Sequence, residues 1–163
     1  MNWHIRTERT EDVAAIHSLT QRAFEGLSYS DGTEPHIINK LRADGDLSLS
    51  LVAEDENIIG HIAFSPVTID EKVGWTGLGP ISVEPTCQGI GVGAALMHAG
   101  LAQMKAARAL GCVLIGDPRY YSRFGFKADG AIQFGEVDAK FVQWLAFGTV
   151  SPQGAVAYSP AFG

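Results

Sequence analysis

The sequence predicts a mixed α/β fold that begins with antiparallel strands and continues with a β-α-β crossover. Residues 47–53 alternate between apolar and polar side chains, and a second apolar run follows at 58–64 after a polar turn. This pattern is typical of a β-hairpin. Farther along, Gly89, Gly91 and Gly93 lie between a strand-like run and a helix-like run, as expected where a strand leads into a crossover helix.

The elements before the hairpin are predicted from the residues at their ends. Residues 2–7 read as a short strand, and Thr10 is expected to cap a first helix whose first turn is acidic. The polar segment 28–33 contains a glycine and is expected to be a loop. Pro35 suits the first turn of a second helix, which we expect to end near Gly45.

Two prolines are expected to interrupt the strands that follow. The second hairpin strand is expected to pause at Pro66 and resume at residues 67–69. Another polar turn then leads to a strand over 76–83. Within that strand, Gly79 and Pro80 should break regular pairing, because proline has no N–H to donate.

The second half of the chain is predicted from the glycine turn onward. We expect a helix, a short buried strand, a short helix and two more strands, at 92–110, 112–115, 117–124, 141–147 and 155–158. The predicted order is therefore β-α-α-β-β-β-α-β-α-β-β. With 163 residues the chain is long enough for one domain with a proper core, which we place at residues 1–163.

Composition excludes several classes of protein. Hydrophobic residues make up 46% and charged residues 18%, which is typical of a globular chain. No apolar run approaches the ~20 residues of a membrane span, and the N-terminus lacks a signal-like stretch, so we expect a cytoplasmic protein without a membrane partner. The only cysteines are Cys87 and Cys112, which form neither a disulfide framework nor a zinc pattern, so no metal is expected. The net charge of −6 argues against nucleic-acid binding.

The glycine turn predicts an anion site, because it bares backbone N–H groups at a helix N-terminus. A P-loop is excluded, since Gly93 is followed by two alanines and not by Lys-Ser or Lys-Thr. Gly89, Gly91 and Ala94 satisfy a dinucleotide fingerprint. That motif should begin directly after its strand, however, and here residues 84–88 intervene.

Two motifs resemble those of one family. The pattern Val-x-Pro-x-x-Gln-Gly-x-Gly-x-Gly over residues 83–93 is similar to the acetyl-CoA signature of the GCN5-related N-acetyltransferase (GNAT) superfamily. Independently, Tyr-Tyr-Ser-Arg-Phe-Gly-Phe over 120–126 resembles the later motif of that family, in which a tyrosine stands four residues before a Gly-Phe pair. The lead-in Gly-Asp-Pro at 116–118 is similar to a bacterial subgroup known mainly as predicted acetyltransferases. The resemblance covers roughly residues 2–147.

The resemblance implies a fold and a coenzyme site. The fold is a mixed central sheet, splayed at the coenzyme site between strands 76–83 and 112–115 and flanked by about four helices. Acetyl-CoA is the implied co-substrate. Its pantetheine arm would pair with backbone groups of Ile81, Ser82 and Val83. Its pyrophosphate would be wrapped by the turn that comprises Gln88, Gly89, Ile90, Gly91, Val92, Gly93 and Ala94.

The resemblance also implies catalytic roles. Tyr121 matches the general acid that protonates the departing thiolate, and Tyr120 is the alternative hydroxyl. No carboxylate occupies the upstream part of the splayed strand, so the base stays open among several residues and a relay through water: Glu84, His61, Asp31, Glu34 and His36. Arg119 and Arg123 either meet the coenzyme phosphates or are exposed helix charges. We interpret Cys87 as structural.

The resulting hypothesis is an N-acetyltransferase that moves an acetyl group directly from acetyl-CoA to a primary amine. The acceptor is a small molecule or a protein, and the acidic net charge favours a cationic or neutral amine. The alternatives are a non-catalytic acyl-CoA sensor and an interaction domain on the same fold. The apolar segment 141–147 either pairs with a second copy or is buried in the monomer, so we expect a monomer or a homodimer.

Overall fold

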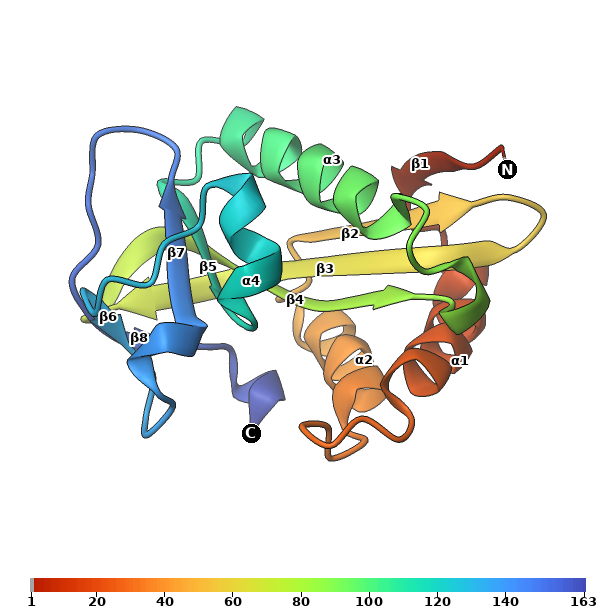
Figure 1. The fold of residues 1–163 in the computed structure, drawn as a ribbon, viewed down its shortest axis with the longest axis horizontal. Helices are drawn as coiled ribbons and strands as arrows, with labels where there is room; N and C mark the ends of the chain where they lie inside the picture. The colour runs from red at the N-terminus through yellow and green to blue at the C-terminus, as the bar shows by residue number, and fades with distance from the viewer. Residues whose placement is uncertain (1) are drawn as a thin grey trace.

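The computed structural model describes residues 2–163, which form one long sheet with helices on both faces (Figure 1). The strand order is β1-β2-β3-β4-β5-β7, with β8 paired to the end of β3 and β6 paired to β8. The strands are β1 His4–Thr7, β2 Leu49–Glu54, β3 Ile58–Ile69, β4 Lys72–Val83, β5 Gly111–Ile115, β6 Ile132–Gln133, β7 Val142–Ala146 and β8 Gly154–Ala157. The helices are α1 Val13–Phe24, α2 Glu34–Asp44, α3 Val92–Ala106 and α4 Pro118–Tyr121.

The sheet is mixed, as the sequence predicts. Strands β1 to β4 are antiparallel neighbours, β4 and β5 are parallel, and β7 returns antiparallel to β5. The parallel pairing of β4 with β5 follows from the crossover through α3, which returns the chain to the same end of the sheet.

The sheet splits between β4 and β5. Their pairing covers only residues 75–77 and 111–113, although β4 continues to Val83 and β5 to Ile115. On the other side of β4, the register with β3 shifts between Ile62 and Phe64, opposite Gly79 and Pro80. The predicted irregularity at these two residues is therefore confirmed. In this part of β4 there is no longer any pairing with β5.

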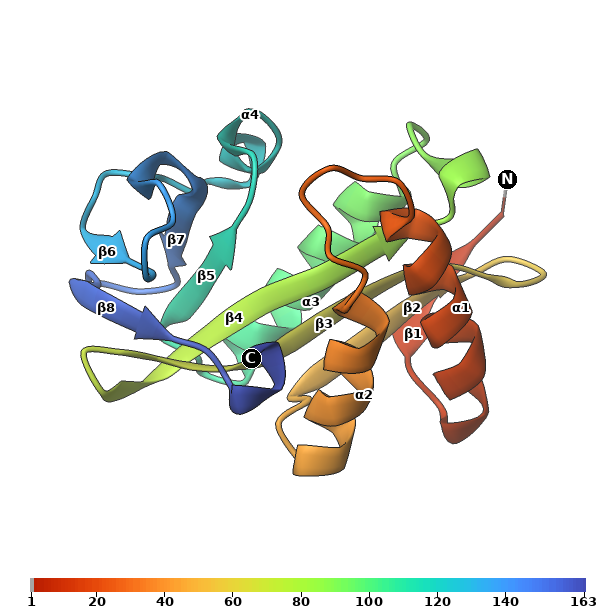
Figure 2. The same cartoon turned by 90° about the horizontal axis from the view of Figure 1, so that it is seen from below.

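Helix α3 covers one face of the sheet, and α1 and α2 cover the other (Figures 1 and 2). Under α3, Leu96 and Met97 are fully buried with Phe64 of β3. Gly100 of α3 lies directly against the Phe64 ring, so a glycine is needed for this close approach. On the opposite face, Ile16 of α1 and Ile38 of α2 form a smaller cluster over the sheet.

Three local expectations were wrong. Strand β3 runs unbroken through Pro66, which pairs with Thr76 of β4. On the other side of β3, the pairing with β2 ends at Phe64 and that with β8 starts only at Thr68, so no neighbour on that side needs the missing N–H. Helix α3 ends at Ala106, before residue 110. Thr10 is not the cap: the first turn follows Arg9, whose N–H donates to Asp12 at 2.6 Å. The two-residue strand β6 was not predicted.

Candidate functional site

The split exposes one edge of β4 to the wedge between β4 and β5. Residues 78–83 have no partner on β5, so their backbone groups on that side are open. The carbonyl of Val83 is already engaged, because it accepts a hydrogen bond from the Gln88 side chain at 3.3 Å. Ile81 and Val83 pack toward the α3 cluster, whereas Ser82 is buried. Ile81 and Val83 can therefore offer a ligand in the wedge only their backbone groups, whereas the side chain of Ser82 lies on the other face of β4, beside His61.

The glycine turn has the geometry of an anion cradle. Gly89 and Gly91 have φ values of 82° and 95°, which residues with side chains rarely adopt. A Cβ at either position would meet nothing within 4 Å, so glycine is required by the backbone conformation and not by lack of room. Gly91 is the N-cap of α3 and supplies no capping side chain. The first N–H groups of the helix, at Val92, Gly93 and Ala94, are thus left for a ligand.

Side chains around the turn divide between the core and solvent. Val92 is buried and can offer a ligand only its N–H group. Ile90 is exposed and can offer both its N–H group and its apolar side chain. A Cβ at Gly93 would stand 3.1 Å from the Tyr120 hydroxyl. Gly93 therefore allows this phenol to approach the first turn of α3. Cys87 is buried in the core cluster, in keeping with a structural role.

Tyr120 and Tyr121 lie in α4, directly after β5. Their rings pack edge to face with centroids 4.9 Å apart. The Tyr121 ring also lies against Gly116, where a Cβ would be only 2.6 Å from it, and against Phe126. Burial, reinforced by the neighbouring phenols Tyr120 and Tyr29, raises the pKa of Tyr121 to about 12. The hydroxyl is therefore protonated at neutral pH, as an acid must be before it donates.

Tyr29 is a residue that the sequence reasoning missed. It lies in the connection between α1 and α2, its side chain is 79% exposed, and its phenol is close enough to influence the pKa of Tyr121. The sequence signal that could have identified Tyr29 is that it is the one aromatic residue of the polar segment 28–33. The structure thus brings this loop toward the end of β5 and α4 that carries the predicted acid.

The proposed bases are mostly engaged. Arg22 of α1 binds Glu84 through both of its carboxylate oxygens, with a closest distance of 2.6 Å. Asp31 accepts hydrogen bonds from the backbone and hydroxyl of Thr33, so it shapes the loop. Glu34 accepts a hydrogen bond from Ser30 at 2.6 Å. None of these three carboxylates is left without a protein partner.

Two histidines remain as candidate bases, and two arginines remain as candidate ligands of the coenzyme phosphates. His61 is fully buried, whereas His36 packs edge-on against His17 with ring centroids 5.3 Å apart. Arg119 is paired with Asp117 at 2.8 Å. Arg123 lies over the Tyr120 ring, 4.6 Å from its centroid, and donates a hydrogen bond to the Tyr120 carbonyl. Arg123 therefore helps to hold Tyr120 in position.

Residues 2–163 lack the features of two other kinds of site. Within this range, no three His, Cys, Asp or Glu side chains are placed to hold a metal ion. No helix in the same range combines the length and apolar character that a membrane crossing requires.

Comparison with known proteins identifies the family. Residues 46–128, about half of the chain, match the family model of the Acetyltransferase (GNAT) domain. The Escherichia coli K12 protein named "Uncharacterized N-acetyltransferase YhbS" is 39% identical over 126 residues, which span 76% of this chain and 72% of that protein.

Solved structures agree over nearly the whole chain. A GNAT family acetyltransferase from Brucella melitensis, solved in complex with acetyl-CoA, is 49% identical, with a TM-score of 0.90 and 99% of both chains covered. Escherichia coli YhbS, solved in complex with CoA, is 30% identical, with a TM-score of 0.92, and 99% of this chain and 92% of that one are covered. Together with the split sheet and the glycine turn, these likenesses show that the chain belongs to the GNAT superfamily of N-acetyltransferases.

Proposed function

We propose that this protein is an acetyl-CoA-dependent N-acetyltransferase that moves the acetyl group directly to a primary amine. The observation that carries the proposal is the open N-terminus of α3 beside the unpaired edge of β4. The relatives from Brucella melitensis and Escherichia coli, solved with acetyl-CoA and CoA, support the same ligand.

The residues present fit the coenzyme. Open N–H groups at Val92, Gly93 and Ala94, and the left-handed turn that precedes them, suit the pyrophosphate, which the helix dipole also favours. The open backbone groups of residues 78–83 suit the pantetheine arm, which would pair with them as an added strand does. The acetyl group would then lie within the wedge between β4 and β5.

The transfer requires an acid for the departing thiolate, and Tyr121 is our proposal for it. Its hydroxyl is protonated, and its ring is fixed by Gly116 and Phe126. Because burial raises its pKa, Tyr121 keeps its proton until the thiolate forms within hydrogen-bond reach, and the resulting phenolate is then a strong base that takes up a proton from the acetylated nitrogen. Backbone N–H groups of β4 near Ile81 would polarise the thioester carbonyl.

The acceptor is a small-molecule or protein amine that enters from the side of the α1–α2 connection. Tyr29 of that connection is exposed and near Tyr121, which supports this approach. On its outer side β7 is bridged by Lys127, which exchanges two backbone hydrogen bonds with Trp144, so this edge supports a monomer over strand pairing in a homodimer. Both cysteines are buried and not joined in a disulfide, which supports a cytoplasmic location.

Calorimetric titration with acetyl-CoA tests the proposal. The unchanged protein should bind with a micromolar dissociation constant, and Gly91→Trp should abolish binding by filling the cradle. Gly130→Trp is the matched control, because Gly130 also has a left-handed backbone and open surroundings but lies outside the site. If the folded, unchanged protein does not bind acetyl-CoA, the transferase function is wrong and an interaction domain is the remaining alternative. Binding without turnover of polyamines, tyramine or a lysine peptide would indicate a sensor.

A further inference from the structure

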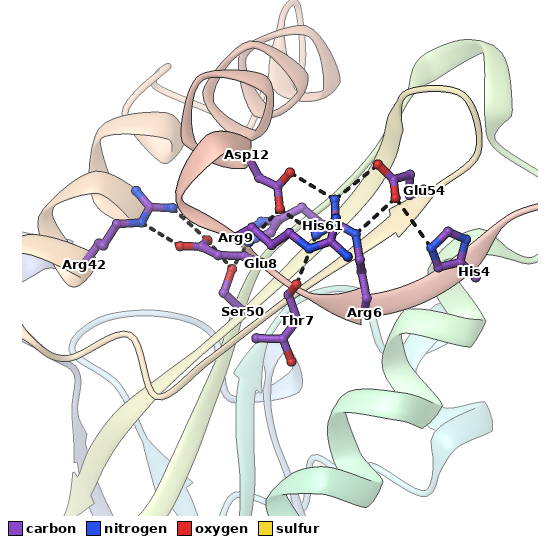
Figure 3. A network of polar contacts seen from close by, with 10 residues as sticks. All are labelled: His4, Arg6, Thr7, Glu8, Arg9, Asp12, Arg42, Ser50, Glu54 and His61. Atoms are coloured by element: carbon purple, nitrogen blue, oxygen red, sulfur yellow. Dashed lines mark hydrogen bonds and ion pairs between the residues drawn. The ribbon is translucent and has the colours of Figure 1, made fainter.

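A chain of polar groups crosses the sheet from the end of β1 to the middle of β3 (Figure 3). The Glu8 carboxylate accepts two hydrogen bonds from Arg42 of α2, each 2.8 Å long. It accepts a third from the Ser50 hydroxyl of β2 at 2.6 Å. The same hydroxyl oxygen is 2.7 Å from Nε2 of His61, which is fully buried. Residues far apart in the sequence are thus joined in one connected series.

The directions of these hydrogen bonds determine the state of the His61 ring. Burial tends to raise the pKa of Glu8, but hydrogen bonds from Arg42 and Ser50 outweigh it and lower that pKa, so Glu8 is ionised and can only accept. Ser50 must therefore give its single hydroxyl hydrogen to Glu8. Its oxygen is left to accept from His61, which places a hydrogen on Nε2. Burial also lowers the pKa of His61 to about 4, so the ring is neutral and Nδ1 carries a bare lone pair.

His61 is a neighbour of the coenzyme strand β4. His61 and Ser82 are directly opposite each other in the register of β3 with β4. His61 Nδ1 and Ser82 Oγ are both buried, and neither has a hydrogen-bond partner among residues 2–163. The two groups make no direct hydrogen bond to each other, and one bridging water between these facing positions would satisfy both.

The other end of the chain reaches solvent. A surface groove of about 290 Å³ is lined by Glu8, Arg42 and Ser50, together with residues of the α2–β2 connection. Glu8 can therefore exchange a proton with water in this groove. The charged groups that act on His61 are Glu8 and Arg42, which neutralise each other as an ion pair.

We propose that Ser82, His61, Ser50 and Glu8 form a proton relay that takes the surplus proton of the acceptor ammonium from the wedge to the outer groove. The proposal rests on the transferase function proposed above and supplies the base that the sequence left open. Glu84, Asp31 and Glu34 are bound to other groups, whereas His61 presents an unpartnered acceptor toward β4.

The ammonium loses one proton, through Ser82 or a bridging water, to Nδ1 of His61. The ring passes its Nε2 proton to Ser50, and Ser50 passes its own hydrogen to Glu8, which releases it into the groove. The free amine then forms the C–N bond as the C–S bond breaks. Tyr121 protonates the thiolate and recovers a proton from the amide nitrogen. The sum is ammonium plus thioester giving amide, thiol and one proton.

Nitrogen NMR of the histidine ring tests the geometry without any acceptor. In the ¹⁵N-labelled protein, alone and with acetyl-CoA, His61 should be protonated at Nε2 and bare at Nδ1 from pH 6 to 8. A ring protonated at Nδ1, or an imidazolium, would overturn the relay.

Kinetics test the function. Ser50→Ala and His61→Gln should lower kcat at pH 7 about a hundredfold. The amine for this test is the one that the unchanged enzyme acetylates fastest among a panel of polyamines, tyramine and a lysine peptide. They should leave acetyl-CoA affinity within about twofold, because neither residue belongs to the coenzyme cradle. The loss should disappear near pH 10, where the amine arrives already deprotonated. A merely structural role would not produce this recovery.

Ser65→Ala is the matched control, since Ser65 is, like Ser50, a buried serine. It lies on β3 outside the chain of contacts, and its hydroxyl has no partner among the described residues. Its kcat should stay within about twofold of the unchanged enzyme. Equal rates for Ser50→Ala, His61→Gln and the control would overturn the relay. Failure of the unchanged enzyme to acetylate any panel amine would instead contradict the transferase function, while the ring tautomer still reports on the relay geometry.

Discussion

Tyr121 has the most direct chemical role at the scale of single residues. Tyr121→Phe keeps the ring against Gly116 and Phe126 and removes only the hydroxyl. We expect kcat to fall about a hundredfold, with acetyl-CoA affinity nearly unchanged. Steady-state kinetics and calorimetry measure the two effects separately. Tyr120→Phe is the comparison, because its hydroxyl lies near Gly93. If Tyr120→Phe shows the larger kcat loss, the acid is Tyr120.

His61 also makes the stability of the protein depend on pH. Its pKa is about 4 in the folded protein, below the ordinary value of 6.5, because burial disfavours the charged ring. Below pH 6.5 the unfolded chain takes up a proton that the folded protein does not. The folded state therefore loses stability as the pH falls from 6.5 toward 4, and this group contributes no pH dependence above that range.

Urea unfolding at pH 7 and pH 5 measures this effect. The free energy of unfolding of the unchanged protein should drop by about 2 kcal/mol more than that of His61→Gln over this interval. Glu8 affects the free energy of unfolding mainly below pH 4.5. Its pKa is lowered in the folded protein, so the folded state loses stability only at a pH where the unfolded chain takes up this proton. Parallel pH dependences of the two proteins would show that His61 takes up protons when folded.

At the scale of elements, the contact of α3 with β3 depends on Gly100. Alanine is favoured over glycine in a helix by about 1 kcal/mol, so helix propensity alone predicts that Gly100→Ala stabilises the protein. A Cβ at this position would collide with the Phe64 ring, which is fully buried. We therefore expect a net loss of about 1–3 kcal/mol in urea unfolding.

A second substitution separates the collision from other effects of Gly100→Ala. Phe64→Leu removes ring atoms at the point of contact, so the double variant should recover part of the loss. A stabilised Gly100→Ala protein would mean that α3 can move away from the sheet without cost.

At the scale of the whole molecule, the sheet is divided at the wedge between β4 and β5. Three residue pairs of β4 and β5 join the two parts, and β8 adds a second connection to the end of β3. A coenzyme in the wedge contacts β4 and the start of α3 together. At about 100 times its dissociation constant it should stabilise the folded protein by about 2.7 kcal/mol.

Hydrogen exchange locates that stabilisation. With acetyl-CoA, the amides of residues 92–94 and those amides of residues 78–83 that point into the wedge should exchange more slowly, because these N–H groups gain partners. Amides of α2 at residues 37–43, which already lie within the helix, are the internal reference. Slower exchange confined to α2 would place the ligand elsewhere.

Features encoded by neighbouring residues could be predicted from the sequence. The hairpin, the two N-terminal helices, the irregularity at Gly79 and Pro80 and the glycine turn each depend on local periodicity or on the φ preferences of a few adjacent residues. For the same reason the acetyl-CoA signature was recognisable, since a phosphate cradle is built from consecutive backbone groups. The assignments of Tyr121 and the coenzyme residues stay predictions for the experiments above.

Contacts between distant residues were decided only by the tertiary structure. Pro66 lies inside a continuous strand because it pairs with Thr76 of β4 on one side, while on the other side the pairing with β2 has ended and that with β8 has not begun. Glu84 is held by Arg22 and is no longer a simple candidate base. Glu8, Ser50 and His61 meet only when β1, β2 and β3 pair in register. The sequence by itself determined the local turns and the family, whereas packing determined which side chains are buried, paired or left open, because those properties depend on residues far apart in the chain.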